Sequence, residues 1–160
     1  MLYWWHKKIG NVIPDKFLDQ DGTLKVYGYT LQDELLSIGK SLGIGNGVWA
    51  KPMQQILLEY AKKYISKSTT VYWYFFKTYL WGEIDSGRPA LGHGMFSDNP
   101  KHVDENETSS YSSDSKNGHV VVIYGYTDDY YICNYGWRGF EKVFLMSPVF
   151  GSVNFLKIEN

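Results

Sequence analysis

The chain has 160 residues, which suits one domain that is large enough to bury a hydrophobic core. Its 16 lysines and arginines nearly balance its 17 aspartates and glutamates, so it lacks the basic surplus that favours binding to nucleic acids or anionic membranes. Apolar residues make up 44% of the sequence, yet no apolar run approaches the roughly 20 residues that span a bilayer. We therefore expect neither a nucleic acid nor a membrane as partner.

Metal and cofactor signals are weak. The single cysteine, Cys133, excludes an internal disulfide and a cysteine-based zinc site. The four histidines form no short-range pair, and the acidic residues between positions 98 and 114 lack the spacing of the twelve-residue calcium loop. We expect no metal and no cofactor. The N-terminal residues do not read as a signal peptide, so a full-length protein that is secreted or displayed at the cell surface would carry its signal outside these residues.

The first predicted element is a helix over residues 1–9. Its apolar side chains have helical spacing, and Gly10 supplies a stop. No residue precedes it to cap its N-terminus, which favours an internal start within a longer domain over a true start at Met1. Such a helix would expose apolar side chains and favour self-association of the chain, namely through Leu2, Trp4 and Trp5.

Two further helices are predicted in the first half. After a connecting stretch over residues 14–29, Thr30 caps a helix, and Asp33 is its capping-box partner. Another helix begins at Pro52, a favourable residue for a first turn, and fades near residues 64–65.

The second half is predicted to consist mainly of strands. Residues 70–76 are β-branched and aromatic, 77–86 suit a short helix, and 97–118 form a polar loop; strand-like runs cover 88–91, 119–126, 130–135, 140–146 and 152–158. Helices that precede strands are typical of α+β domains. We expect one domain over 1–160, in which a helical part (1–69) packs on an antiparallel sheet (70–160).

Two of the predicted strands carry the candidate catalytic residues. His119 follows Gly118 at the start of one strand, and Asn134 lies near the end of the next, with a hairpin connection at 127–129. We expect the hairpin to bring the imidazole and the carboxamide together at one end of the sheet. An amide oxygen that accepts from one ring nitrogen fixes the tautomer, and the other nitrogen can then take a proton from a nucleophile.

These residues resemble a known family. Gly-His, an apolar strand, Gly-Tyr and then Asn-x-Gly-Trp-x-Gly (residues 118–139) are similar to the second half of papain-like cysteine peptidases. The closest likeness is to the bacterial double-glycine (bacteriocin-processing) peptidase-like and streptopain-like branches, in which a segment like Ser86-Gly87-Arg88-Pro89 is also common. The resemblance covers residues 85–146 well and the helical half only in outline.

The resemblance implies a papain-like fold and a peptidase that cleaves a peptide or protein substrate by thiolate acyl transfer, without a cofactor. It implies that His119 is the general base and that Asn134 orients it. Trp137 would shield their hydrogen bond from water. Gly118 and Gly136 would let the backbone approach the cleft closely.

The chain departs from the family at the nucleophile. The catalytic cysteine of these enzymes stands at the N-terminus of a buried helix, whose continuation resembles residues 1–5 here, so we expect the cysteine upstream of Met1 and this fragment to be inactive. The oxyanion-hole glutamine would also lie upstream. Cys133 is adjacent to Asn134 in a strand, so its side chain should point to the other face, into the core, and should not be the nucleophile.

Two alternatives stay open. The chain could be a non-catalytic domain that keeps the fold, or a carbohydrate- or peptide-binding module in which the Gly-His strand is coincidental. The aromatic run at 72–76 is more typical of a two-sided core than of a sugar platform. His93 either lines a substrate cleft or, as its glycine neighbours favour, is a histidine at a solvent edge.

Overall fold

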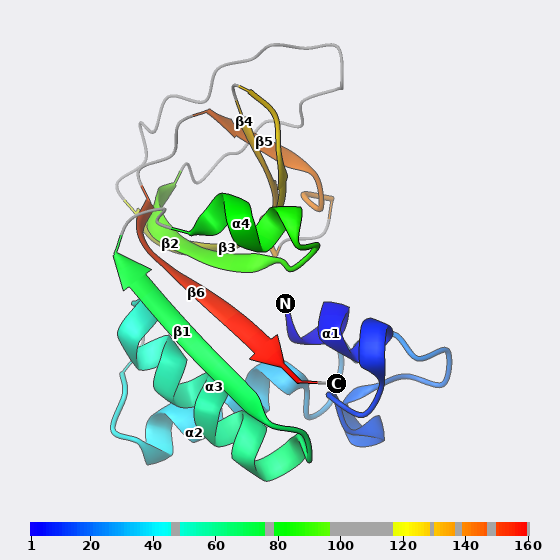
Figure 1. Cartoon of the computed structure of the whole chain (residues 1–160). Helices are drawn as coiled ribbons and strands as arrows, with labels where there is room; N and C mark the ends of the chain where they lie inside the picture. The colour runs from blue at the N-terminus through cyan, green and yellow to red at the C-terminus, as the bar shows by residue number, and fades with distance from the viewer. Residues whose placement is uncertain are drawn as a thin grey trace. The chain divides into compact units, whose positions relative to one another are not determined.

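The computed structural model contains helices followed by an antiparallel sheet, which confirms the predicted α+β class. It describes residues 1–45, 49–75, 79–96, 117–128, 130–136, 139–146 and 150–159. The helical elements are α1 (Leu2–Ile9), the 3-10 turn η1 (Asp15–Phe17), α2 (Leu31–Ser41), α3 (Ala50–Tyr64) and α4 (Leu80–Asp85). The strands are β1 (Thr69–Phe75), β2 (Ala90–Phe96), β3 (Asn117–Tyr126), β4 (Tyr130–Asn134), β5 (Val143–Met146) and β6 (Phe150–Ile158) (Figure 1).

The chain divides into two compact units. The first contains Met1–Tyr72 and Leu156–Asn160, and the second contains Trp73–Phe155. The strand order is β1-β6-β2-β3-β4-β5, so the last strand of the chain lies between the first two. The unit boundary falls close to the predicted change from helices to strands at residue 69, but the final residues return to the first unit. That a single domain spans 1–160 stays a prediction.

The first unit keeps its predicted helices. The capping box of α2 is present, because the Asp33 amide donates to Thr30 Oγ1 at 3.2 Å and the Thr30 amide donates to Asp33 Oδ2 at 2.9 Å. Helix α3 begins at Ala50, which places Pro52 within its first turn. The side chain of Tyr60 on α3 is buried and donates to the Val12 carbonyl at 3.0 Å.

Helix α1 differs from its prediction in exposure. It ends at Gly10 with a φ of 68°, as expected for a glycine stop. Leu2 and Trp5, however, are buried, and the Trp5 indole donates to the Leu156 carbonyl at 3.0 Å. Trp4 is half-buried. The expectation that Leu2 and Trp5 are exposed for self-association is therefore wrong, because this face of the helix contacts the last strand of the same unit.

The second unit has its own core. Helix α4 lies over β2 and β3 (Figure 1). The buried side chains of this core are Leu80, Ala90, Phe96, Val121, Ile123, Tyr131, Cys133, Tyr135, Val143, Leu145, Val153 and Phe155. Arg88 connects the end of α4 to the entrance of β2, because its guanidinium donates twice to the Glu83 carboxylate, at 2.6 and 3.0 Å.

Most of the predicted polar loop, residues 97–116, lies outside the described residues, and β3 begins at Asn117. No helix in the described part of the chain is long and apolar enough to cross a membrane.

Candidate active site

The register between β3 and β4 decides which side chains can meet. Near the hairpin, Tyr126 pairs with Tyr131 and Gly125 with Ile132, whereas further along Ile123 pairs with Cys133 and Val122 with Asn134. Tyr124 is therefore an extra residue on β3, a β-bulge. Because side chains alternate along a strand, this one-residue shift changes which β3 side chains share a face with Cys133 and Asn134, the β4 residues beyond the bulge.

The bulge separates the two predicted catalytic side chains. Asn134 is opposite Val122 and shares its face, whereas His119 lies three positions away on the other face, with Val121 and Ile123. The hairpin itself is confirmed, but the prediction that it brings the His119 imidazole and the Asn134 carboxamide together is wrong. With an unbulged register, Asn134 would lie opposite Ile123 and on the face of His119, which is the arrangement that the sequence suggested.

Tyr135 takes the place next to His119. The Nε2 atom of His119 is 2.9 Å from the Tyr135 backbone carbonyl oxygen, and the two ring centroids are 5.1 Å apart. Since a carbonyl oxygen can only accept, this contact places the ring proton on Nε2 and leaves Nδ1 as the basic nitrogen. Phe96 on β2 meets the His119 ring edge-on, at a centroid distance of 6.5 Å. The imidazole is half-buried.

The side chain of Asn134 shapes the turn that presents this carbonyl. Its Oδ1 accepts from the Gly136 amide at 2.7 Å, two residues ahead, as in an Asx turn. Gly136 has a φ of 82°, a conformation that residues with a side chain rarely adopt. Asn134 and Gly136 thus fix the peptide group that joins Tyr135 to Gly136 at the end of β4. The carbonyl of this peptide group is that of Tyr135.

The other supporting residues give a mixed result. A Cβ added at Gly118 or Gly136 would meet nothing within 4 Å in the described part of the chain, so no contact there requires a glycine at either position. That the two glycines let the backbone approach the cleft closely stays a prediction. Gly136 is explained by its positive φ instead. Trp137, the predicted shield, lies outside the described residues.

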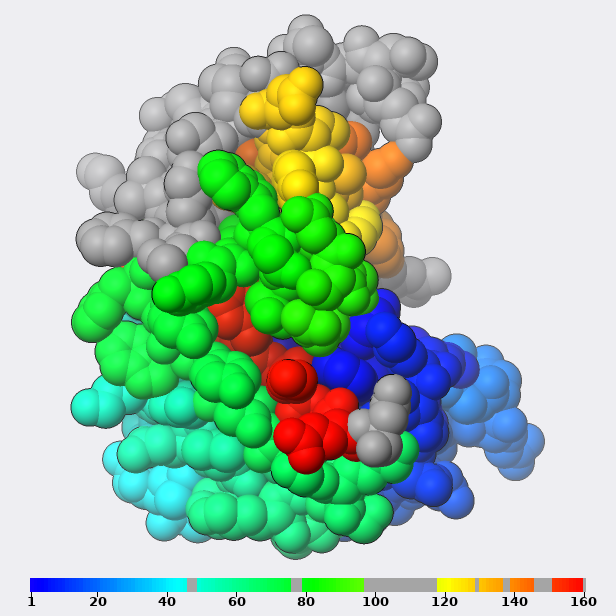
Figure 2. Space-filling view, viewed as in Figure 1, coloured from blue at the N-terminus to red at the C-terminus, as the bar shows by residue number. Residues whose placement is uncertain are grey.

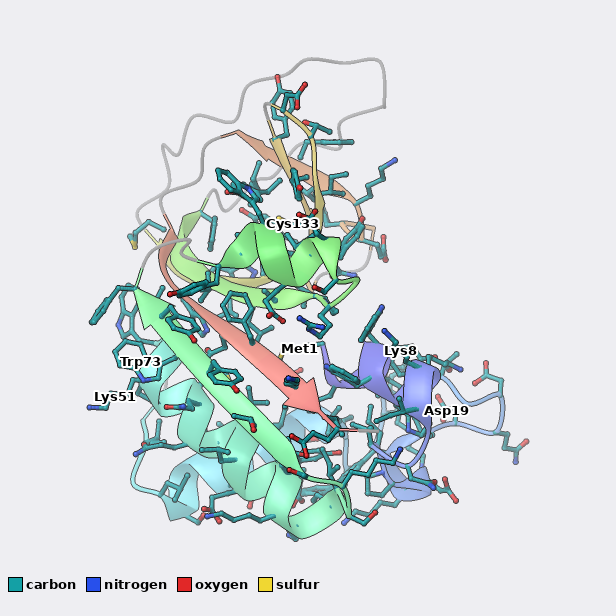
Figure 3. The ribbon with its side chains drawn as sticks, in the orientation of Figure 1. Met1, Lys8, Asp19, Lys51, Trp73 and Cys133 are labelled. Carbon is teal, nitrogen blue, oxygen red and sulfur yellow. The ribbon has the colours of Figure 1, made fainter. Side chains whose placement is uncertain are left out.

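Cys133 is unsuited to act as the nucleophile. Its side chain is fully buried in the core of the second unit, and burial raises the pKa of its thiol; Figure 3 labels the residue at the edge of α4. It is opposite Ile123 and therefore shares the face of His119, contrary to the prediction, but lies about 13 Å further along the strand direction at ~3.3 Å per residue. The prediction that Cys133 points into the core is confirmed by its burial.

A buried histidine–carboxamide pair does exist, but at other positions. His93 on β2 is 1% exposed and its Nε2 lies 2.7 Å from Oδ1 of Asn154, which is fully buried on β6. The favoured expectation of a solvent-edge histidine is therefore wrong. His93 is opposite Val120, so it lies on the face of the sheet that His119 does not share.

Of the two remaining histidines, the structure describes one. His6 accepts from the Ile13 amide through Nδ1 at 3.1 Å and so stabilises the chain after α1, whereas His102 lies outside the described residues. Within the described residues, no group of three or more His, Cys, Asp or Glu side chains is arranged to hold a metal ion.

Comparison with known proteins gives one match. No protein-family model matches the chain, and no curated protein matches it. Among solved structures, it is similar to the crystal structure of a putative C39-like peptidase from Bacillus anthracis, with 19% sequence identity and a TM-score of 0.47. The match covers 72% of this chain and 62% of that chain, so this chain spans less than two thirds of the solved structure.

At this level of similarity, the roles of individual residues depend on this chain's own geometry.

Proposed function

We propose that this chain is the histidine-bearing part of a cysteine peptidase that cleaves peptide bonds by thiolate acyl transfer. His119 is the general base in this proposal. The observation that carries it is the hydrogen bond between His119 Nε2 and the Tyr135 carbonyl oxygen, at 2.9 Å, on a half-buried ring at the start of β3. This contact supplies what such a base needs, which is a fixed tautomer and a fixed ring direction.

The aromatic surroundings support the same role. Tyr135 and Phe96 pack against the imidazole, and their own rings lie 6.1 Å apart, so the three rings restrict one another. Both partners are buried, which limits the access of water to the Nε2 side of the ring. A hydrogen bond in such surroundings is stronger than one in water.

The chemistry then follows in balanced steps. Nδ1 of His119 takes the proton of a cysteine thiol, and the thiolate sulfur attacks the carbonyl carbon of the scissile peptide. The imidazolium returns that proton to the departing amine as the C–N bond breaks, which leaves a thioester. Water, deprotonated by the same nitrogen, hydrolyses the thioester to the carboxylic acid and regenerates the thiol.

The nucleophilic thiol has to come from outside these 160 residues, because the one cysteine of the chain, Cys133, is fully buried in the core. A helix N-terminus would lower the pKa of the incoming thiol. The substrate is a peptide or protein.

The test joins the chain to the coding sequence that precedes Met1 in its gene. The product is incubated with denatured proteins, and new peptide N-termini are counted by mass spectrometry. We expect cleavage that iodoacetamide abolishes and that falls at least 100-fold in His119→Ala, because general-base catalysis contributes about 10²–10⁴-fold. The matched control, His102→Ala, should cleave like the parent.

Two outcomes would overturn the proposal. One is cleavage that persists in His119→Ala, and the other is a preceding coding sequence with no cysteine.

A further inference from the structure

Two aromatic side chains from different elements of the second unit lie together at its surface. Trp81 on α4 is 53% exposed, and Tyr126 at the end of β3 is 38% exposed. Their ring centroids are 6.3 Å apart, and the ring planes are tilted by 44°. Helix α4 lies in front of β3 in Figure 1, and Figure 2 shows its green atoms beside the yellow atoms of β3. The two rings therefore form an aromatic surface that faces solvent.

A carboxylate is held beside these rings. Asp85 is four residues after Trp81, so both side chains lie on the same side of α4. The Tyr126 hydroxyl donates to Asp85 Oδ1 at 2.6 Å, and this hydrogen bond raises the pKa of Tyr126. An ionised carboxylate accepts through both of its oxygens, so Asp85 can bind a further donor while it holds the tyrosine.

The segments that carry the two rings have an excess of negative charge. Residues 80–89 contain the charged side chains of Glu83, Asp85 and Arg88, and Asp128 follows Tyr126 in the hairpin turn. The Arg88 guanidinium is paired with Glu83, whereas no salt bridge among the described residues involves Asp85 or Asp128. Since ring faces and carboxylates both attract positive charge, the surface is complementary to a cation.

Among the cations that proteins carry, a guanidinium suits this surface best. It is planar and weakly hydrated, so it stacks on an aromatic face, and the N–H groups at its edge donate to a carboxylate. A lysine ammonium is a compact and strongly hydrated charge that does not stack in this way. Tryptophan, tyrosine and arginine are also the residues most enriched at the centres of protein interfaces.

We propose that Trp81, Tyr126 and Asp85 bind an arginine side chain of a peptide, with the guanidinium stacked on the indole and paired with the carboxylate. One exposed cation–aromatic contact and one surface ion pair give a weak complex, so the dissociation constant lies in the millimolar range. Tyr126 is about 23 Å from His119 along β3, at ~3.3 Å per residue. The inference is therefore independent of the proposed peptidase chemistry.

Nuclear magnetic resonance of the indole N–H groups tests the choice of ligand, with the Trp81 signal assigned from its loss in Trp81→Phe. The probe is the blocked peptide acetyl-Gly-Arg-Gly-amide, which should shift the Trp81 signal saturably. The same peptide with citrulline, the neutral isostere of arginine, should bind about tenfold more weakly because it lacks the charge. The lysine peptide should bind more weakly than the arginine peptide as well.

Substitutions test the residues, with binding followed at the backbone amide of Tyr126. Asp85→Asn keeps an oxygen that accepts from the Tyr126 hydroxyl but removes the charge, so binding should weaken about tenfold. Trp81→Ala removes the stacking surface and should abolish measurable binding. The matched control is Trp49→Ala, at a 54% exposed tryptophan of the first unit, which should bind like the parent. Asp85→Asn decides the test if circular dichroism shows that Trp81→Ala does not fold.

The proposal fails if the arginine and citrulline peptides bind alike, if Asp85→Asn binds like the parent, or if Trp49→Ala loses binding. It also fails if the arginine peptide leaves the Trp81 signal unchanged. A soluble oligosaccharide that shifts this signal in place of the peptide would identify the surface as a carbohydrate site instead.

Discussion

At the scale of single residues, the His119 imidazole forms its hydrogen bond with a backbone carbonyl, that of Tyr135. A carbonyl in a peptide group cannot be removed by substitution, but the turn that holds it can be weakened. Asn134 is the residue at which this turn can be weakened, since its Oδ1 accepts from the Gly136 amide. In the proposed function, Asn134 would therefore be a positioning residue that acts through the Tyr135 peptide.

Substitutions of Asn134 should separate this role from a direct contact. Asn134→Ala removes the acceptor of the Gly136 amide and should cost about 1 kcal/mol in the free energy of unfolding. Asn134→Asp keeps an acceptor at the same place and should cost less than half as much. Urea titration measures both. Equal losses in the two variants would contradict the Asx-turn role.

The tautomer of His119 gives a second residue-scale prediction. The Tyr135 carbonyl should keep the ring proton on Nε2. Nitrogen-15 chemical shifts of the neutral ring report this directly, and His6, whose Nδ1 accepts from an amide, should carry its proton on Nε2 as well. A His119 ring that holds its proton on Nδ1 would remove the basis of the proposed catalytic role.

Glu34 is the buried carboxylate of the first unit, with 4% exposure. Burial alone would raise its pKa, but hydrogen bonds from Lys63, Tyr29 and Tyr64 lower the pKa to about 2. A pKa that is lower in the folded state stabilises the fold above the unfolded-state value near 4.5, and this stability is lost as the pH falls towards 2.

We therefore expect Glu34 to contribute about 2–3 kcal/mol at neutral pH, and this contribution should disappear between about pH 5 and pH 2. In Glu34→Gln, the free energy of unfolding should be lower at pH 7 and should vary less over this range. Glu59→Gln is the control, because its partner Lys62 is largely exposed and such surface pairs contribute little. Parallel pH profiles for the parent and Glu34→Gln would contradict this reading.

At the scale of elements, the β-bulge at Tyr124 explains why sequence patterns found the right strands and the wrong neighbours. The alternation of apolar residues along β3 and β4 is visible in the sequence, and both strands lie where they were expected. A single extra residue leaves that alternation almost unchanged within each strand while it exchanges the faces between strands. The contact between His119 and the Tyr135 carbonyl was missed for this reason, and because no side-chain pattern marks the position of a backbone carbonyl.

Gly125, next to the bulge, should be sensitive to substitution. A Cβ at this position would lie 3.2 Å from Cδ1 of Ile132 and 3.4 Å from its Cβ. Gly125→Ala should therefore cost about 1–2 kcal/mol of stability, as overpacking does. Ile132→Val removes the Cδ1 atom, so the cost of Gly125→Ala should be smaller in that background. A double-mutant cycle by thermal or urea unfolding measures the difference, and strict additivity would contradict this contact.

At the scale of the whole molecule, the sheet order was beyond the reach of the sequence. Helices, strands and the α+β class follow from local periodicity and from caps such as Thr30 and Asp33. That β6 inserts between β1 and β2 depends on contacts between residues far apart in the chain, which leave no local signal. The burial of Leu2 and Trp5 was missed for the same reason, since the carbonyl that Trp5 binds belongs to Leu156.

The inner position of β6 predicts its protection from solvent exchange. Val153 and Phe155 lie on a strand with neighbours on both sides and have buried side chains, whereas β5 stands at an end of the sheet. Amide hydrogen exchange should be slowest in β6 and markedly faster in β5. Equal rates in the two strands would indicate that the strand order is not that of the folded protein in solution.

The hydrogen bond from the Trp5 indole to the Leu156 carbonyl joins the first helix to the last strand within one unit, and Figure 1 marks N and C in the same region. Tags attached before Met1 and after Asn160 would thus emerge as neighbours. A donor and an acceptor fluorophore at these two places would transfer energy efficiently in the native protein and poorly after denaturation. The indole–carbonyl contact therefore makes the chain suitable for an optical reporter of its own folding.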